Sequence, residues 1–322
     1  MYDNISWSLP RLENVAADEH LARHVRRLDI GMATRVAGAV ETEYVERMRD
    51  NLCGILKRLT SLHTLVVVVM SVNPARRLGF TRTVVAALQA VQLPKLTEFD
   101  LHLAFQGDLE YIVKGPQATA LISITDICSR LKHLALGAER GTSSLSGDGH
   151  NNQPGNAARP IVPGTGHLRT LVEASSHLES LAIDVQNTLD IDGWVFSPRL
   201  AALRLRRVEA SPATLSSLFS RAGGLRYVEL RRVKLKYGQW SQILEALHAS
   251  SSSCLVELYM RKCRHQKLGT GPDDEAERKK RREDAIAVFT ILQATLSENR
   301  YNLRLPPVDR AENFIENAIT ID

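Results

Sequence analysis

The sequence is poor in cysteine, and it has no long apolar run. Four cysteines in a chain this long are too few for a disulfide framework, and they form no CxxC pair; they are Cys53, Cys128, Cys254 and Cys263. The longest apolar run, Leu65 to Met70, is far shorter than the ~20 residues that a membrane helix needs. Met1 to Pro10 contains Asp3 and no apolar segment of the kind a signal peptide requires. We therefore expect an intracellular protein, cytoplasmic or nuclear, with no membrane partner.

Aromatic residues are also scarce, at 5% of the chain, although 44% of the residues are hydrophobic. The apolar content consists mainly of Leu, Val and Ala, which suits thin, repeated layers. A chain of 322 residues is about twice the usual length of one domain, so two domains or one elongated repeat array would fit. The net charge of +5 indicates only a mild preference for acidic partners.

A short apolar pattern, L-x-x-L-x-L with conservative replacements, occurs eight times along the chain. Its first positions are Val25, Leu62, Leu96, Leu131, Leu178, Leu200, Leu225 and Leu255. The alternation of apolar and polar residues within each copy predicts a short strand with one buried face. In the last three copies the pattern continues to Val208, Val233 and Cys263, which is the longer form of a leucine-rich repeat.

Between these strands the apolar spacing becomes helical, with one apolar stripe in each segment. The predicted helices are 43–59, 83–91, 120–128, 214–219 and 240–247. Strand and helix in strict alternation predict parallel strands with helices on the outer side. The expected fold is therefore an α/β leucine-rich-repeat solenoid, a curved parallel sheet with outer helices.

Two breaks in the repeat define the expected domains. Residues 139–166 are rich in Gly and Pro and almost devoid of large apolar residues, so we expect a disordered insert there. Residues 273–297 have an acidic start, a basic middle and an apolar end, which predicts a long helix. We expect a solenoid over residues 1–263 and a C-terminal helical cap and tail over 264–322, because an open solenoid end exposes its core.

Two stretches carry a family resemblance. His24-Val-Arg-Arg-Leu-Asp-Ile, and Leu225-Arg-Tyr-Val-Glu-Leu-Arg-Arg-Val-Lys-Leu followed by Gly238-Gln-Trp-Ser-Gln-Ile-Leu-Glu-Ala-Leu, resemble the repeat region of fungal F-box proteins with leucine-rich repeats. In that family the F-box docks on a ubiquitin-ligase core and the repeats recruit the protein to be modified. Ser8-Leu-Pro-Arg-Leu-Glu is faintly similar to an F-box opening, but the first repeat begins at Val25. The resemblance therefore implies the substrate-receptor half, with a ligase core as partner only if an F-box exists outside this chain.

The sequence offers little support for catalysis. Asp100, His102 and His133 form the only acid/base group that the repeat could assemble, and they are better explained as polar residues on an exposed strand face, since no orienting group or oxyanion donor accompanies them. Cys254, Cys263 and His265 lack the spacing of a zinc site. The pair Gly223 and Gly224 resembles a helix C-cap more than a phosphate loop. We expect no enzyme activity, no metal site and no cofactor.

The residues between the buried leucines give the candidate binding site. Alternation sends them to the face opposite the core, where Arg and Tyr offer contact area and directional hydrogen bonds. The predicted partner-binding residues are Arg204, Arg206, Tyr227, Arg231, Tyr259 and Arg261. Earlier strands place Asp29, Asp100, His102 and Asp184 on the same face. The alternative interpretation is that these are solubilising charges on an exposed sheet.

A second basic group lies in the predicted C-terminal helix. It consists of Arg278, Lys279, Lys280, Arg281 and Arg282. Such a run resembles a nuclear-import or phosphate-binding segment. It is also typical of a solvated helix face, where the neighbouring acidic residues form i,i+4 ion pairs.

These observations favour a protein that binds another protein, with an acidic or phosphorylated partner on the late repeats. The alternative function is a scaffold solenoid that associates with nucleic acid through a basic inner face, with strongly salt-dependent affinity.

Overall fold

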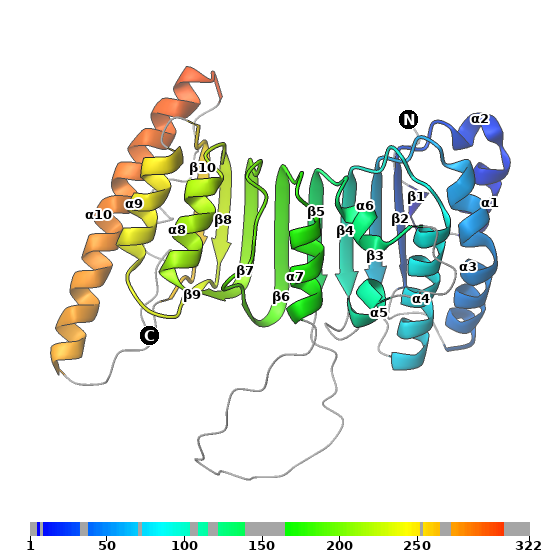
Figure 1. Ribbon diagram of the computed structural model, residues 1–322, viewed down its shortest axis with the longest axis horizontal. Helices are drawn as coiled ribbons and strands as arrows, with labels where there is room; N and C mark the ends of the chain where they lie inside the picture. Colours follow the sequence, from blue (N-terminus) through cyan, green and yellow to red (C-terminus); the bar gives the residue numbers. More distant parts are fainter. Residues whose placement is uncertain are drawn as a thin grey trace, which may run out of the picture. The chain divides into compact units, whose positions relative to one another are not determined.

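The computed structural model describes residues 5–6, 9–32, 38–69, 73–103, 109–114, 122–138, 165–251, 254–264 and 272–305. Strands and helices alternate along most of the chain (Figure 1), but no helix separates the strands Ser180–Asp190 and Ala202–Ala210. The chain divides into two compact units, an N-terminal unit of Met1–Cys128 with Gly137–Leu171 and a C-terminal unit of Ser129–Leu136 with Val172–Asp322.

The N-terminal unit is a parallel sheet with helices. Its strands β1 to β4 pair in chain order and are all parallel; they are β1 (Ile5–Ser6), β2 (Arg27–Met32), β3 (Thr64–Val69) and β4 (Glu98–Leu103). Its helices are α1 (Leu9–Ala17), α2 (Glu19–Ala22), α3 (Gly38–Arg58), α4 (Pro74–Ala90), α5 (Leu109–Lys114) and α6 (Ile124–Cys128). Helix α1 packs on α3, where Glu13 accepts hydrogen bonds from Arg47 and Asn51.

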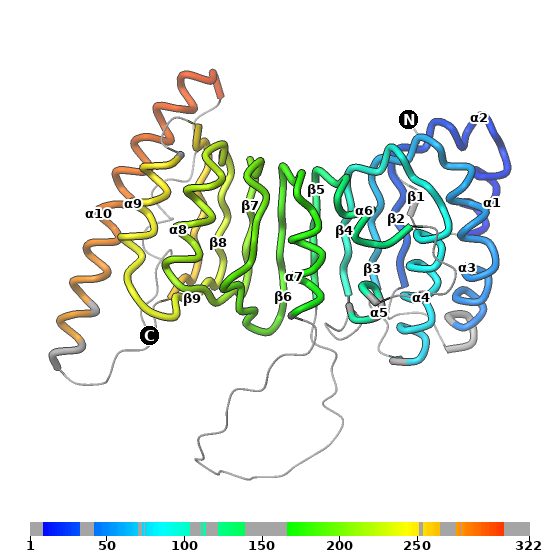
Figure 2. Tube along the Cα trace, viewed as in Figure 1, coloured from blue at the N-terminus to red at the C-terminus, as the bar shows by residue number. Residues whose placement is uncertain are grey.

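The C-terminal unit repeats the same arrangement. Strand β5 (His133–Ala138) and helix α7 (Thr165–Ala174) each have residues in both units. The remaining strands are β6 (Ser180–Asp190), β7 (Ala202–Ala210), β8 (Tyr227–Arg231), β9 (Lys234–Leu235) and β10 (Glu257–Arg261). The remaining helices are α8 (Pro212–Arg221), α9 (Trp240–Ser251) and α10 (Pro272–Asn302). Helices α8 and α9 lie along one face of these strands (Figure 2), and α10 packs against α9.

A shared hydrogen-bond pattern sets the strand register. Just ahead of a strand, one backbone carbonyl accepts bonds from two consecutive N–H groups of the next repeat. The carbonyls that do so belong to Arg26, His63, Lys132, Glu179, Ala201 and Arg226. Because these copies begin with the same contact, equivalent residues of the strands that it joins fall opposite each other.

The predicted fold class is confirmed, since all eight apolar copies form strands and the strands pair in parallel within each unit. The first apolar residue of each copy lies two positions before its strand and is almost completely buried. Thus the repeated leucines form the core, as alternation along a strand requires.

The predicted helices are confirmed in place, although their ends differ. Residues 43–59 lie in a helix that begins earlier, at Gly38, and residues 83–91 overlap one that begins at Pro74. The C-terminal helix extends from Pro272 to Asn302. Helices α1, α2, α5 and α7 were not predicted. The first two residues of α7 belong to the Gly- and Pro-rich stretch that predicts disorder.

Of the predicted disordered insert, residues 139–164 lie outside the described residues, and 165–166 begin α7. His265 also lies outside them. The predicted solenoid–cap boundary at residue 263 stays a prediction. Among the described residues, no helix is both long and apolar enough to cross a membrane.

Three successive repeats share an unusual backbone conformation, inside β7 and directly after β8 and β10. Arg207, Arg232 and Lys262 have φ of 57°, 53° and 53°, in the left-handed region that costs an L-residue about 1–2 kcal/mol. The residues that follow them, Val208, Val233 and Cys263, are completely buried, so the left-handed residue returns the chain toward the core. Burial raises the pKa of the Cys263 thiol to about 12, consistent with its predicted place as a core repeat residue.

An acidic residue connects three segments of the C-terminal unit. One Asp192 carboxylate oxygen accepts hydrogen bonds from the Ser211 N–H and the Thr214 hydroxyl, both at 2.7 Å, and the other lies 2.8 Å from the Lys236 ammonium. Partial burial alone would raise the pKa of Asp192, but these hydrogen bonds outweigh it and lower the pKa from 3.8 to about 2. The carboxylate therefore holds the start of α8 to the segment after β9.

We expect Asp192→Asn to lower the free energy of unfolding at pH 7 by about 1–2 kcal/mol, allowing for solvent screening. Since the folded-state pKa is depressed, this contribution is present above the ordinary pKa of 3.8 and is lost as pH falls toward about 2. Urea unfolding at several pH values measures this contribution. The matched control is Glu257→Gln, which removes an exposed carboxylate and should change the free energy of unfolding little. If Asp192→Asn lowers the free energy of unfolding by the same amount at every pH, the electrostatic explanation is wrong.

Candidate functional site

The six predicted partner-binding residues lie on β7, β8 and β10 of the C-terminal unit, in register. Arg206, Arg231 and Arg261 stand opposite one another in one row across the three strands. Arg204, Glu229 and Tyr259 form the adjacent row. Because parallel strands lie about 4.8 Å apart, the structure brings together side chains that are more than fifty residues apart in the sequence.

Acidic side chains neutralise part of this surface. The Glu229 carboxylate lies between two arginines, 2.6 Å from Arg204 Nε and 2.5 Å from Arg231 Nε. Arg206 pairs with Asp184 on β6 at 2.7 Å. The guanidinium of Arg231 also stacks over the Tyr259 ring, 4.7 Å from its centroid. Alternation along single strands could not reveal these pairs, because they join residues of different repeats.

The groups left available are therefore fewer than the sequence suggests. Arg206 and Arg231 are half-buried, whereas Arg261 is exposed and makes no ion pair with any described residue. The Tyr227 side chain is 46% exposed and stands at the start of β8. Arg261 and Tyr227 thus offer a free cation and a free aromatic ring, while Glu229 and Asp184 fix the orientation of the other arginines.

The residues with left-handed backbone, Arg207, Arg232 and Lys262, add basic side chains to this surface. They lie outside the six predicted binding residues. Arg207 donates to the Val185 carbonyl at 3.4 Å, while Arg232 and Lys262 are exposed. The Arg-Arg or Arg-Lys pair ahead of each inward residue is the signal that could have found them. Alternation alone predicts one outward side chain at that point, and the left-handed residue inserts a second.

The basic run 278–282 lies on α10. Arg281 pairs with Glu277 at 2.8 Å, as the i,i+4 spacing predicts. Lys279, Lys280 and Arg282 are exposed on the helix, and the side chain of Arg278 lies outside the described residues. A nuclear-import role for the run stays a prediction.

The predicted acid/base group is divided between the two units. On β4, His102 Nε2 lies 2.8 Å from the Asp100 carboxylate, and both belong to the N-terminal unit. His133 belongs to the C-terminal unit. Within the described part of the chain, no cluster of three or more His, Cys, Asp or Glu side chains could hold a metal ion.

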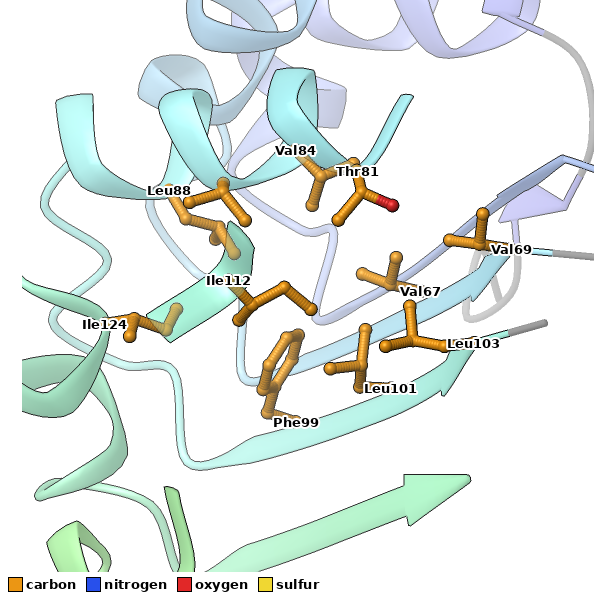
Figure 3. A pocket seen from close by; sticks show the side chains of 11 residues that line it. Val67, Val69, Thr81, Val84, Leu88, Phe99, Leu101, Leu103, Ile112 and Ile124 are labelled. Atoms are coloured by element: carbon orange, nitrogen blue, oxygen red, sulfur yellow. The ribbon is translucent and has the colours of Figure 1, made fainter. Parts of the chain in front are cut away.

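A small apolar cavity lies in the core of the N-terminal unit, between β3, β4 and the helices above them (Figure 3). Its volume is about 10 Å³, and its wall includes Val67, Phe99 and Ile112. Such a space is comparable to one water molecule, so it is a gap in packing and too small for an organic ligand.

Comparison with known proteins leaves the family open. No family model matches the chain, and no curated protein matches it. Among solved structures it is similar to an internalin from Listeria monocytogenes, with 12% identity over 81% of this chain and 77% of that chain and a TM-score of 0.30. That likeness is too distant to support a functional argument. What identifies the fold is the chain's own repeat: eight apolar copies, each a strand, with parallel pairing within each unit.

Proposed function

We propose that this chain is a non-catalytic repeat protein that binds an acidic or phosphorylated segment of a protein partner on β7, β8 and β10. The observation that carries the proposal is the row of Arg206, Arg231 and Arg261 across three adjacent strands. Arginine binds carboxylate and phosphate groups through paired hydrogen bonds. Solenoid proteins commonly use the surface built from successive repeats for recognition.

The free and the paired arginines have different roles in this proposal. Arg261 is exposed and unpaired among the described residues, so it is available for the first contact. Arg231 is held between Glu229 and the Tyr259 ring, which preorganises its guanidinium and lowers the entropy lost on binding. Tyr227 adds exposed aromatic area at the start of β8, four residues before Arg231 on the same strand.

The resemblance to F-box repeat proteins supports a substrate-recruiting role for this surface. In that role a bound partner would reach a ubiquitin-ligase core through an F-box outside these residues. The proposed location is intracellular, in the cytoplasm or nucleus, as that role requires. Co-expression of the chain with an F-box-containing product of the same gene, followed by a ubiquitination assay, would test this part separately.

The test of the binding surface is a peptide array that presents acidic, phosphorylated and neutral peptides to the full chain. We expect the acidic and phosphorylated peptides to be bound preferentially. The triple variant Arg206→Ala, Arg231→Ala, Arg261→Ala should weaken that binding by about a hundredfold or more, as loss of several central arginines does in other interfaces.

The matched control is the triple variant Lys279→Ala, Lys280→Ala, Arg282→Ala, which removes the same charge from exposed positions of α10. It should bind as the unaltered chain does. Equal binding to neutral peptides, or equal loss in both variants, would contradict the proposed surface. The melting temperatures of both variants show whether removal of the half-buried Arg206 and Arg231 destabilises the fold.

A further inference from the structure

Nine residues at the carboxyl ends of β7, β8 and β10 form what we call the basic array. Its three rows follow from strand pairing and from the repeated left-handed turn. They are Arg206, Arg231 and Arg261; Arg207, Arg232 and Lys262; and Glu209, Lys234 and Arg264. Eight of these nine residues are basic and one is acidic. The array lies entirely within the C-terminal unit.

Internal ion pairs neutralise only part of the array. Lys234 pairs with Glu209 at 2.9 Å. In the first row, Arg206 pairs with Asp184 and Arg231 pairs with Glu229. Arg232, Arg261 and Lys262 are exposed and make no ion pair with any described residue. These three belong to two neighbouring strands, so their backbones lie about 5 Å apart. The free protein therefore holds adjacent like charges without a counter-charge.

The fold requires the left-handed turn but does not require a basic side chain there. Gly adopts positive φ without steric conflict, and Asn and Asp do so more readily than Arg or Lys. Yet Arg or Lys occupies this position in three successive repeats. The turn itself serves the packing, but the basic side chains at these strained positions do not, and such a choice of residue is a reason to look for a ligand. Here the ligand must be an anion.

We propose that the basic array binds the phosphate backbone of a single-stranded nucleic acid. Two inter-strand spacings give the array a width of about 10 Å, and its rows cover a similar length along the strands. A strand of nucleic acid places a phosphate at every nucleotide and can neutralise successive cations across that area. This site goes beyond the proposed protein-binding surface, because five of its basic residues lie outside the six predicted ones.

The basic residues that extend beyond the proposed protein-binding row favour a polymeric anion as the ligand of the whole array. Three of the eight cations, Arg206, Arg231 and Lys234, are already ion-paired, and a peptide with one or two phosphates would neutralise only part of the charge that the others carry. Nearby, Tyr227 on β8 is 46% exposed, and its ring could stack on a base, as aromatic residues do in single-strand binding proteins. The acidic Glu257 lies opposite Tyr227 on β10, four residues before Arg261, so it borders the array without interrupting it.

The test is fluorescence anisotropy of a fluorescein-labelled single-stranded oligonucleotide of mixed sequence with the full chain, across a range of salt concentrations. The array variant is Arg232→Asn, Lys262→Asn, because Asn removes the charge and suits the left-handed backbone. We expect it to raise the Kd about tenfold at low salt and to reduce the slope of log K against log salt by about 1–1.5, since two phosphate contacts are lost. The variant Arg232→Gly, Lys262→Gly should behave in the same way.

The matched control is Lys279→Gln, Lys280→Gln, which removes two exposed charges from α10 and should leave both quantities nearly unchanged. Equal weakening in the control, failure of the unaltered chain to bind the oligonucleotide, or tighter binding to a doubly phosphorylated peptide of equal charge would each overturn the proposal. The array variant should still bind the acidic peptides selected above, so that failure here and failure of the proposed function are distinguishable.

Discussion

Leu230→Asp is expected to unfold the C-terminal unit. Leu230 is completely buried, and it lies in the middle of the parallel set, with Leu205 on one side and Met260 on the other. A carboxylate there would have no partner, and an unpaired buried charge costs several kcal/mol. The loss is comparable to the whole stability of many domains, about 5–15 kcal/mol. Hydrogen exchange should show peptides of β7, β8 and β10 losing their protection together.

The control for this variant is Tyr227→Asp, which places the same charge on the same strand. Because Tyr227 is 46% exposed, the new carboxylate remains hydrated, and the melting temperature should fall by only a few degrees. If both variants destabilise the protein equally, the assignment of Leu230 to the core and Tyr227 to the exposed face is wrong.

Trp240→Ala is expected to have the second largest effect. Trp240 opens α9 and is completely buried, so its removal leaves a cavity and should cost about 3–5 kcal/mol. Its Nε1–H also donates to the Arg264 carbonyl at 3.2 Å, which links α9 to the basic array. Urea denaturation of the full chain measures the loss.

Trp240→Phe separates the two contributions of this side chain. Phe keeps most of the apolar volume but removes one of the two donors to the Arg264 carbonyl, which still accepts from the Leu235 N–H at 2.9 Å, so it should cost about 0.5–1.5 kcal/mol. The exposed control Tyr237→Ala, at a side chain that is 55% exposed, should change stability by no more than about 0.5 kcal/mol. A Phe variant as unstable as the Ala variant would mean that the hydrogen bond, and not the packing, dominates.

The repeat pattern alone predicted the strands and the row of arginines, for a physical reason. Alternation fixes which side chains of a strand face the core, and parallel copies of one motif repeat that choice. Arg206, Arg231 and Arg261 occupy the same position of three copies, so they had to share a row once the strands paired. The outcome depended only on backbone periodicity.

Contacts between repeats could not be predicted in the same way. Whether Glu229 lies between Arg204 and Arg231 depends on side-chain rotamers on two strands. The left-handed backbone of Arg232 carries no signal in its residue type, because positive φ usually indicates Gly or Asn. Both features determine how much positive charge the surface keeps, and both depend on the three-dimensional arrangement of neighbouring repeats.

The last strand bears on whether copies of this chain join to one another. Among the described strands β10 pairs only with β8, and a strand with an unpaired edge is a template for edge-to-edge aggregation. Here the edge is short, and Glu257, Arg261 and the left-handed Lys262 place charge and a change of direction along it. The Asn299 side chain from α10 donates to the Leu255 carbonyl at 2.7 Å, just ahead of the strand. An incoming strand would have to displace that hydrogen bond and bury those charges. The free edge of β10 therefore disfavours edge-to-edge pairing between copies of the chain.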